Sequence, residues 1–118
     1  MTRDKAELFA KHWVESWNAH DLEAVLSHYS DDFEMSSPLI ARITGEASGT
    51  LRGKAAVGDY WKLALEKMPD LHFELIEVFG GASSVVIYYK AVLGLLATEV
   101  FFFDTQGQVI KAAAHYNQ

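Results

Sequence analysis

The sequence contains no cysteine, and this absence removes several kinds of chemistry at once. Disulfides, thiolate metal sites and cysteine nucleophiles are excluded. Basic side chains are also few: 10 lysines and arginines stand against 16 aspartates and glutamates, giving a formal net charge of −6. No basic run interleaved with aromatic residues occurs. The sequence therefore predicts neither nucleic acid nor an anionic membrane surface as a partner.

Long apolar runs are missing too. No stretch approaches the roughly 20 apolar residues that span a bilayer, and Met1–Lys5 leads into a charged segment rather than an apolar signal core. What the chain does have is 118 residues, 50% of them hydrophobic and 13% aromatic. This composition suffices for a folded core. We expect a single domain over residues 1–118 in a soluble, cytoplasmic protein.

Three helices are predicted from apolar residues at helical spacing. The first runs from about Asp4 to Ala19, with Asp4 as its cap. The second is shorter and begins after Asp21. The third runs from about Lys54 to Met68 and ends there because Pro69 cannot continue a helix.

From Leu71 onward apolar residues alternate, which predicts a sheet. A shift in this alternation across Leu75–Ile76 indicates a β-bulge, and glycines at positions 80, 81 and 94 mark turns. The remaining expected strands are a short one at Phe33–Ser36 and three long ones within Ser84–Leu93, Thr98–Phe103 and Val109–Tyr116.

The segment Ser37–Gly53 fits neither pattern. It contains Pro38 and three glycines, yet it is too apolar for an ordinary solvated loop. A long connection of this kind is often a lid or binding loop, and the alternative is a small hairpin that covers the core.

This order of elements predicts an α+β architecture, with the helices on one face of an antiparallel sheet. The runs Val85–Tyr89 and Val100–Phe103 are apolar at consecutive positions, so both faces of the sheet should be covered. No further segment of the chain remains to cover the outer face. We therefore expect a second copy to do so, in a homodimer.

Glu99 is the one carboxylate in an otherwise apolar strand. Residues two apart share a face of a strand, so Glu99 should point toward the helices together with Phe101 and Phe103. Burial disfavours the charged form, and its pKa should therefore be raised.

Two kinds of partner are open to this carboxyl group. Pairing across Gly94 would place Tyr88 or Tyr89 opposite Glu99, where a hydroxyl can hydrogen-bond to it. A cation, Lys90, could pair with it only if that side chain also points inward.

Four motifs, in their order and spacing, resemble the nuclear transport factor 2-like superfamily, and most closely its SnoaL-like branch, which is related to the ketosteroid isomerases. They are Trp17–Leu22, Tyr29–Asp32, Leu51–Lys54 and Glu99–Asp104 ahead of Gly107. The resemblance implies a cone of bent sheet wrapped around three helices, an apolar pocket inside it, and frequent dimerisation through the outer face of the sheet.

The resemblance also implies roles for three residues. The ketosteroid isomerases have a catalytic aspartate before a proline, where this chain has Ser37 before Pro38, and a serine without a paired base does not take up a proton near neutral pH. Their oxyanion-binding tyrosine corresponds to Trp13, which can donate a hydrogen bond but cannot shuttle a proton. Their neutral carboxylic acid corresponds to Glu99, which could donate to a carbonyl oxygen.

Aromatic and hydroxyl side chains are the candidates for the pocket wall, although aromatic residues at helical spacing are usually core. The candidates are Trp13, Trp17, Tyr29, Ser37, Tyr60, Trp61, Tyr89, Phe101 and Tyr116. We expect a small hydrophobic organic molecule as the ligand. Two functions remain open: an isomerase, cyclase or dehydratase that uses Glu99 in acid–base chemistry, and a non-catalytic binding or dimerisation module.

The five histidines do not predict a metal site. His12, His20 and His28 are dispersed over the first two helices without ligand spacing. His115 should face the interface or the solvent, and the alternative is a polar role near the site. The pair Asp31–Asp32 is better explained as a turn than as a catalytic pair. We expect no metal and no cofactor.

Overall fold

The computed structural model describes the whole chain, residues 1–118. Six strands form one curled sheet in the order β2-β1-β6-β5-β4-β3. The strands are β1 (Tyr29–Ser36), β2 (Thr50–Arg52), β3 (Glu74–Gly80), β4 (Ser84–Lys90), β5 (Leu96–Phe103) and β6 (Val109–Tyr116). The helices are α1 (Arg3–Asn18), α2 (Leu22–Leu26), α3 (Pro38–Thr44) and α4 (Lys54–Lys67), with a short 3-10 turn η1 (Val92–Gly94).

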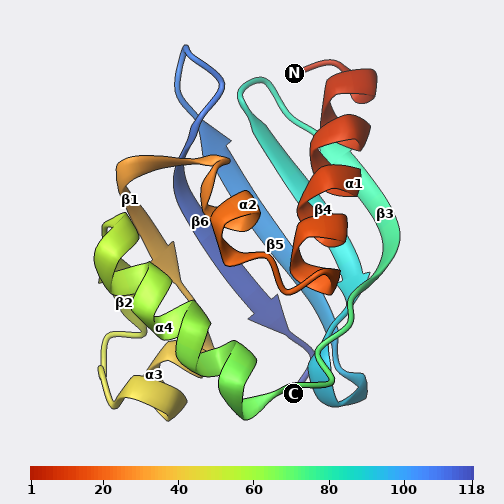
Figure 1. Ribbon diagram of the computed structural model, residues 1–118. Coiled ribbons are helices and arrows are strands. Elements are labelled where there is room, and N and C mark those ends of the chain that lie inside the picture. The colour runs from red at the N-terminus through yellow and green to blue at the C-terminus, as the bar shows by residue number, and fades with distance from the viewer.

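The helices α1, α2 and α4 lie on one face of the sheet (Figure 1). The α+β architecture expected from the sequence is therefore confirmed. The sheet is not wholly antiparallel, however, because β1 and β6 run parallel. None of the helices has the length and apolar character needed to cross a bilayer. The cytoplasmic location stays a prediction.

The helix boundaries differ from the sequence prediction at a few points. Thr2, not Asp4, is the N-cap of α1, and its hydroxyl accepts a hydrogen bond from the Lys5 amide at 3.2 Å. Asp21 caps α2 as predicted, through a bond from the Ala24 amide. α2 ends at Leu26, and β1 begins at Tyr29, earlier than the strand expected at Phe33–Ser36.

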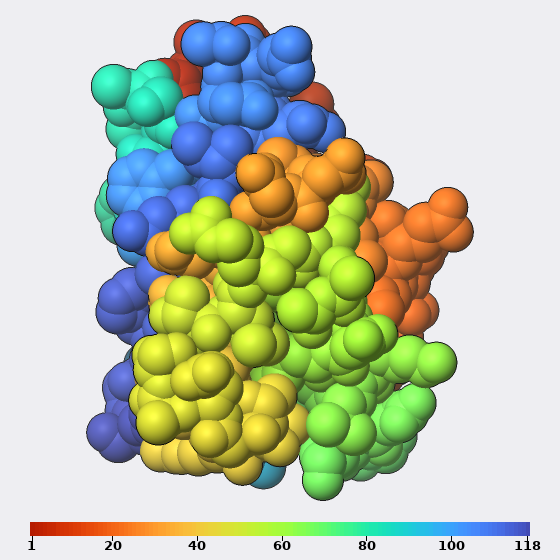
Figure 2. Space-filling view, turned by 90° about the vertical axis from the view of Figure 1, so that its left-hand side faces the viewer, coloured from red at the N-terminus to blue at the C-terminus, as the bar shows by residue number.

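The segment Ser37–Gly53 is neither a lid loop nor a plain hairpin. Ser37 caps α3 by accepting a hydrogen bond from the Leu39 amide at 3.2 Å, and Pro38 occupies the first turn of that helix. Serine followed by proline is a regular helix start. After Gly45 ends α3 with a φ of 79°, β2 pairs with β1. In Figure 2 the yellow and green atoms of residues 37–67 form one continuous surface on this side.

The register of the long strands is set by their turns. The predicted bulge is confirmed, since the pairing of β3 with β4 shifts between Leu75 and Glu77. Glu99 pairs with Ile87, however, and not with Tyr88 or Tyr89. The reason is the length of the connection: Lys90 pairs with Leu96, so five residues separate the strands instead of two or three.

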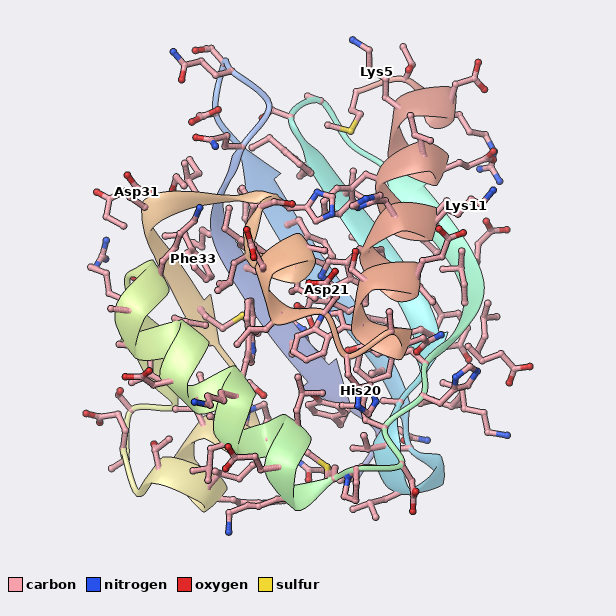
Figure 3. The ribbon with its side chains drawn as sticks, in the orientation of Figure 1. Lys5, Lys11, His20, Asp21, Asp31 and Phe33 are labelled. Atoms are coloured by element: carbon pink, nitrogen blue, oxygen red, sulfur yellow. The ribbon has the colours of Figure 1, made fainter.

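The end of α1 is attached to the segment that leads into β3. The Asn18 side chain donates to the Phe73 carbonyl at 2.9 Å and accepts from the Phe73 amide at 2.7 Å. A ring nitrogen of His20 lies 2.8 Å from the Leu71 carbonyl oxygen. Figure 3 shows His20 at the end of α1 beside this segment. These contacts hold Leu71 and Phe73 in place under the helix.

The outer face of the sheet carries half-exposed apolar side chains. Val86, Val100 and Ala113 lie side by side on β4, β5 and β6, and Phe102 is 41% exposed. At one end of this face Glu34 pairs with Arg52 at 2.8 Å and with Lys111 at 3.6 Å. We call Val86, Val100, Phe102 and Ala113 the outer apolar patch.

We expect Asn18→Ala to destabilise the protein by about 1–3 kcal/mol, because the variant leaves the Phe73 amide and carbonyl without their partners. Denaturant unfolding followed by circular dichroism measures this loss. Asn117→Ala is the matched control: the Asn117 side chain makes only one, solvent-exposed bond to the backbone, at Leu96. Equal losses in the two variants would contradict the role given to Asn18.

Candidate functional site

Glu99 lies on the inner face of β5, between Ile87 on β4 and Ala114 on β6. Its side chain is only 4% exposed. Phe101 shares this face as expected and is fully buried. Phe103 also turns inward, where its ring packs edge-on against Phe9. The predicted direction of the Glu99 side chain is confirmed.

Burial in apolar surroundings raises the pKa of Glu99 to about 8, and a hydrogen bond from Tyr89 lowers it only in part. That bond runs from the Tyr89 hydroxyl to Glu99 Oε1, at 3.2 Å. Lys90 points away from the site and is exposed, so it does not neutralise the carboxylate. The predicted rise in pKa is confirmed, and Glu99 is mainly protonated at neutral pH.

Glu99 forms part of the wall of an internal cavity of about 50 Å³. Most of the residues predicted for the pocket meet there: Trp13, Trp17, Ser37, Tyr60, Trp61, Tyr89, Glu99 and Tyr116. The wall also contains residues that sequence reasoning missed: Met35, Leu39, Ala64, Met68, Leu71, Phe73 and Val92. Three of them could have been predicted from the sequence. Leu71 and Phe73 alternate inward, and Met68 continues the apolar stripe of α4.

Tyr29 and Phe101 are predicted pocket residues that do not line the cavity. Both are fully buried in the surrounding core. Tyr29 accepts a hydrogen bond from the Trp13 indole N–H at 3.0 Å. The polar atom of Trp13 is therefore already paired with another side chain, and Trp13 contributes an apolar ring to the cavity wall.

Three further hydroxyl groups line the cavity with Glu99 and Tyr89: those of Ser37, Tyr60 and Tyr116. Burial raises the pKa of Tyr60 to about 12, partly offset by hydrogen bonding with Ser37. Burial and the nearby Glu99 raise the pKa of Tyr116 as well. The tyrosines are thus neutral hydrogen-bonding groups, and Glu99 is the group of this set that exchanges a proton near neutral pH.

Trp17 supplies an additional donor. Its side chain lines the cavity, and its indole N–H is buried without a hydrogen-bond partner. Leaving a buried donor unpaired costs about 1–3 kcal/mol. A ligand oxygen that accepts from this N–H would remove that penalty.

The histidines lie away from the cavity. His12 Nδ1 and His28 Nε2 are 2.7 Å apart, a contact that their spacing in the sequence does not predict because it joins α1 to the turn between α2 and β1. The structure contains no group of three or more potential metal ligands. His115 is exposed on the outer face of β6, opposite Thr98. Asp31 and Asp32 are exposed on β1, where Asp31 approaches Lys54 at 3.9 Å.

Residues 10–116 match the SnoaL-like domain family. The chain belongs to this family. A SnoaL-like protein of unknown function from Burkholderia thailandensis is 54% identical, with a TM-score of 0.96 and coverage of 99% of this chain and 98% of that one. No curated protein matches the chain.

More distant solved structures share the fold. A proposed SnoaL-like isomerase from Agrobacterium tumefaciens has a TM-score of 0.77 at 14% identity, covering 98% of this chain and 99% of that one. A proposed ketosteroid isomerase from Kribbella flavida has a TM-score of 0.75 at 15% identity, covering 98% and 79%. The match to the SnoaL-like domain family confirms the resemblance to the SnoaL-like branch of the nuclear transport factor 2-like superfamily. At these low identities the last two likenesses show the fold alone.

We expect the free energy of unfolding to fall with rising pH. The fall covers the pH range in which Glu99 is ionised in the unfolded chain but still protonated in the folded one. The unfolded carboxyl group loses its proton near pH 4.5, whereas the folded one keeps it until about pH 8. Burial lowers the pKa of His28 from 6.5 to about 4, which makes stability rise with pH below 6.5 and opposes this trend there. The fall in the free energy of unfolding should therefore be clearest between about pH 6.5 and 8, where its slope approaches about 1.4 kcal/mol per pH unit.

Urea unfolding at several pH values measures this slope. In Glu99→Gln the fall should disappear, because glutamine does not ionise, while the exposed Glu74→Gln should keep it. An unchanged slope in Glu99→Gln would show that Glu99 does not carry a raised pKa.

Proposed function

We propose that the protein binds a small hydrophobic molecule through a carbonyl group in this cavity, and that Glu99 acts on it as a general acid–base. The observation that carries the proposal is a buried carboxyl group, without a cation, in a cavity wall that is mainly apolar and otherwise offers only neutral hydrogen-bonding groups. A pKa of about 8 lies close to neutral pH, where a group that must both give and take a proton works best.

The chemistry that suits this arrangement is proton movement next to a carbonyl. One oxygen of neutral Glu99 gives its proton to the carbonyl oxygen, while the other takes a proton from the adjacent carbon. The ligand becomes an enol and Glu99 is again a neutral acid. Where a C=C bond lies next to the enol, return of a proton at the far end of that bond, with the hydroxyl proton passing back to Glu99, would give an isomer. The Trp17 N–H and the tyrosine hydroxyls stabilise the charge that develops on the oxygen.

A second candidate function is ligand binding without catalysis. It is favoured by Ser37, which lies in the cavity wall where the ketosteroid isomerases are expected to have a catalytic aspartate. The Ser37 oxygen also caps α3, so part of its role is structural. This candidate keeps the cavity and the polar contacts to a ligand but assigns no proton transfer to Glu99.

We expect the wild-type protein to accelerate exchange of the α-hydrogens of 2-butanone in deuterated water, followed by NMR. Glu99→Gln should lower this rate about 100-fold or more, because the amide N–H is far too weakly acidic to protonate the carbonyl and the amide oxygen is a much weaker base than a carboxylate. The exposed Glu74→Gln is the matched control and should exchange at the wild-type rate.

The indole N–H signal of Trp17 reports binding in parallel samples in ordinary water, where the N–H keeps its proton. A shift of this signal without accelerated exchange would contradict catalysis and support the second candidate. Exchange that persists in Glu99→Gln would contradict the role of Glu99.

We also propose that the outer apolar patch is covered by a second copy of the chain. The patch lies at the centre of the sheet, and the charges of Glu34, Arg52 and Lys111 at its margin are already paired with one another. A two-fold interface would let the same patch serve both copies.

Size-exclusion chromatography with light scattering should give roughly twice the monomer mass of 13.2 kDa. Val100→Asp should reduce the mass to that of a monomer, because a charge would be buried in the interface. Leu8→Asp on α1 replaces an apolar residue that is 68% exposed and should leave the dimer intact. A monomeric wild-type protein would exclude the proposed interface.

A further inference from the structure

The inner cavity is too small to hold more than a carbonyl group and the few carbons attached to it. Its volume is about 50 Å³. Pockets for organic ligands usually have about 300–1,000 Å³. A ligand whose carbonyl reaches Glu99 must therefore extend beyond this cavity.

A second hollow of about 310 Å³ adjoins the cavity. It lies between the chain that follows α4, residues 67–72, and the connection from β4 to β5, residues 91–93. Figure 1 shows the end of α4 and this connection at the same end of the molecule. Met68, Leu71 and Val92 line both spaces, so these side chains form the wall between them.

Leu93 is the unusual residue of this hollow. It is 88% exposed, although leucine is strongly apolar, and its φ of 59° lies in the left-handed region. A bulky residue other than glycine rarely adopts this conformation, which stores strain and tends to occur at ligand-binding positions. Nothing within the chain covers the side chain, and it lines the hollow.

We propose that this hollow is a second subsite of the same ligand, which binds an unbranched apolar chain attached to the carbonyl group held at Glu99. The inference rests on the proposed function of the inner cavity. The chain of the ligand passes between Met68 and Val92 and rests on Leu93. The ligand class is an elongated aliphatic carbonyl compound, and the charged groups of Lys67 and Asp70 stay at the rim in water.

The test compares 2-butanone, 2-hexanone and 2-octanone in NMR titrations that follow the indole N–H signals. Each methylene that enters the hollow should tighten binding about fourfold, the fold-change that corresponds to about 0.8 kcal/mol. Leu93→Asn should reduce this gain. The difference in affinity between the wild-type protein and the variant should therefore grow with the chain length of the ketone. Asparagine tolerates a positive φ, so the variant keeps the turn.

Leu8→Asn is the matched control: it removes an exposed leucine from α1 and should keep the full gain with chain length. Equal affinity for the three ketones, with 2-butanone still shifting the Trp17 signal, would overturn the second subsite and leave the proposed function standing. A chain-length gain that Leu93→Asn does not reduce would also overturn the subsite. Failure of all three ketones to bind would overturn both proposals.

Discussion

The main physical constraint in this structure is the burial of one carboxyl group, that of Glu99. Glu99 is enclosed by apolar side chains and receives one hydrogen bond, from Tyr89. An ionised carboxylate in such a place would need a cation or several donors, and a leucine would pack there without any of them. The protein instead keeps an acid that stays neutral until about pH 8. Local departures of this kind from the rules of core packing are expected at functional sites.

The motifs that identify the family mainly build the frame around this acid. Asn18 and His20 bind the backbone at Phe73 and Leu71, and Asp21 caps α2. These contacts fix one wall of the cavity without supplying a reactive group. Gly53, from another motif, adopts a φ of 93° where its amide bonds to β1. A framework of this kind can position the catalytic groups of different reactions equally well. Family membership therefore does not determine the reaction.

Most of the fold could be predicted because local patterns determine it. Alternation along β5 gave the direction of Glu99, and the apolar stripe of α4 gave its length to within one residue. The pairing of Glu99 with Ile87 could not be predicted, since it depends on a five-residue connection whose length the sequence does not reveal. The contact between His12 and His28 depends on how α1 packs against the turn between α2 and β1. The start of α3 at Ser37–Pro38 matches known capping preferences, a signal that could have predicted this helix.

The position of Glu99 also limits the kind of proton transfer that the cavity can support. The tyrosine hydroxyls in the wall have raised pKa values, and the Ser37 hydroxyl already accepts a bond from α3. They can orient an oxygen but not remove a proton at neutral pH. In the proposed reaction, all proton transfer would therefore occur on the side of the ligand that faces β5. A reaction that needs an acid and a base on opposite faces is disfavoured, whereas one in which a single carboxyl group gives and takes back a proton on the same face suits this geometry.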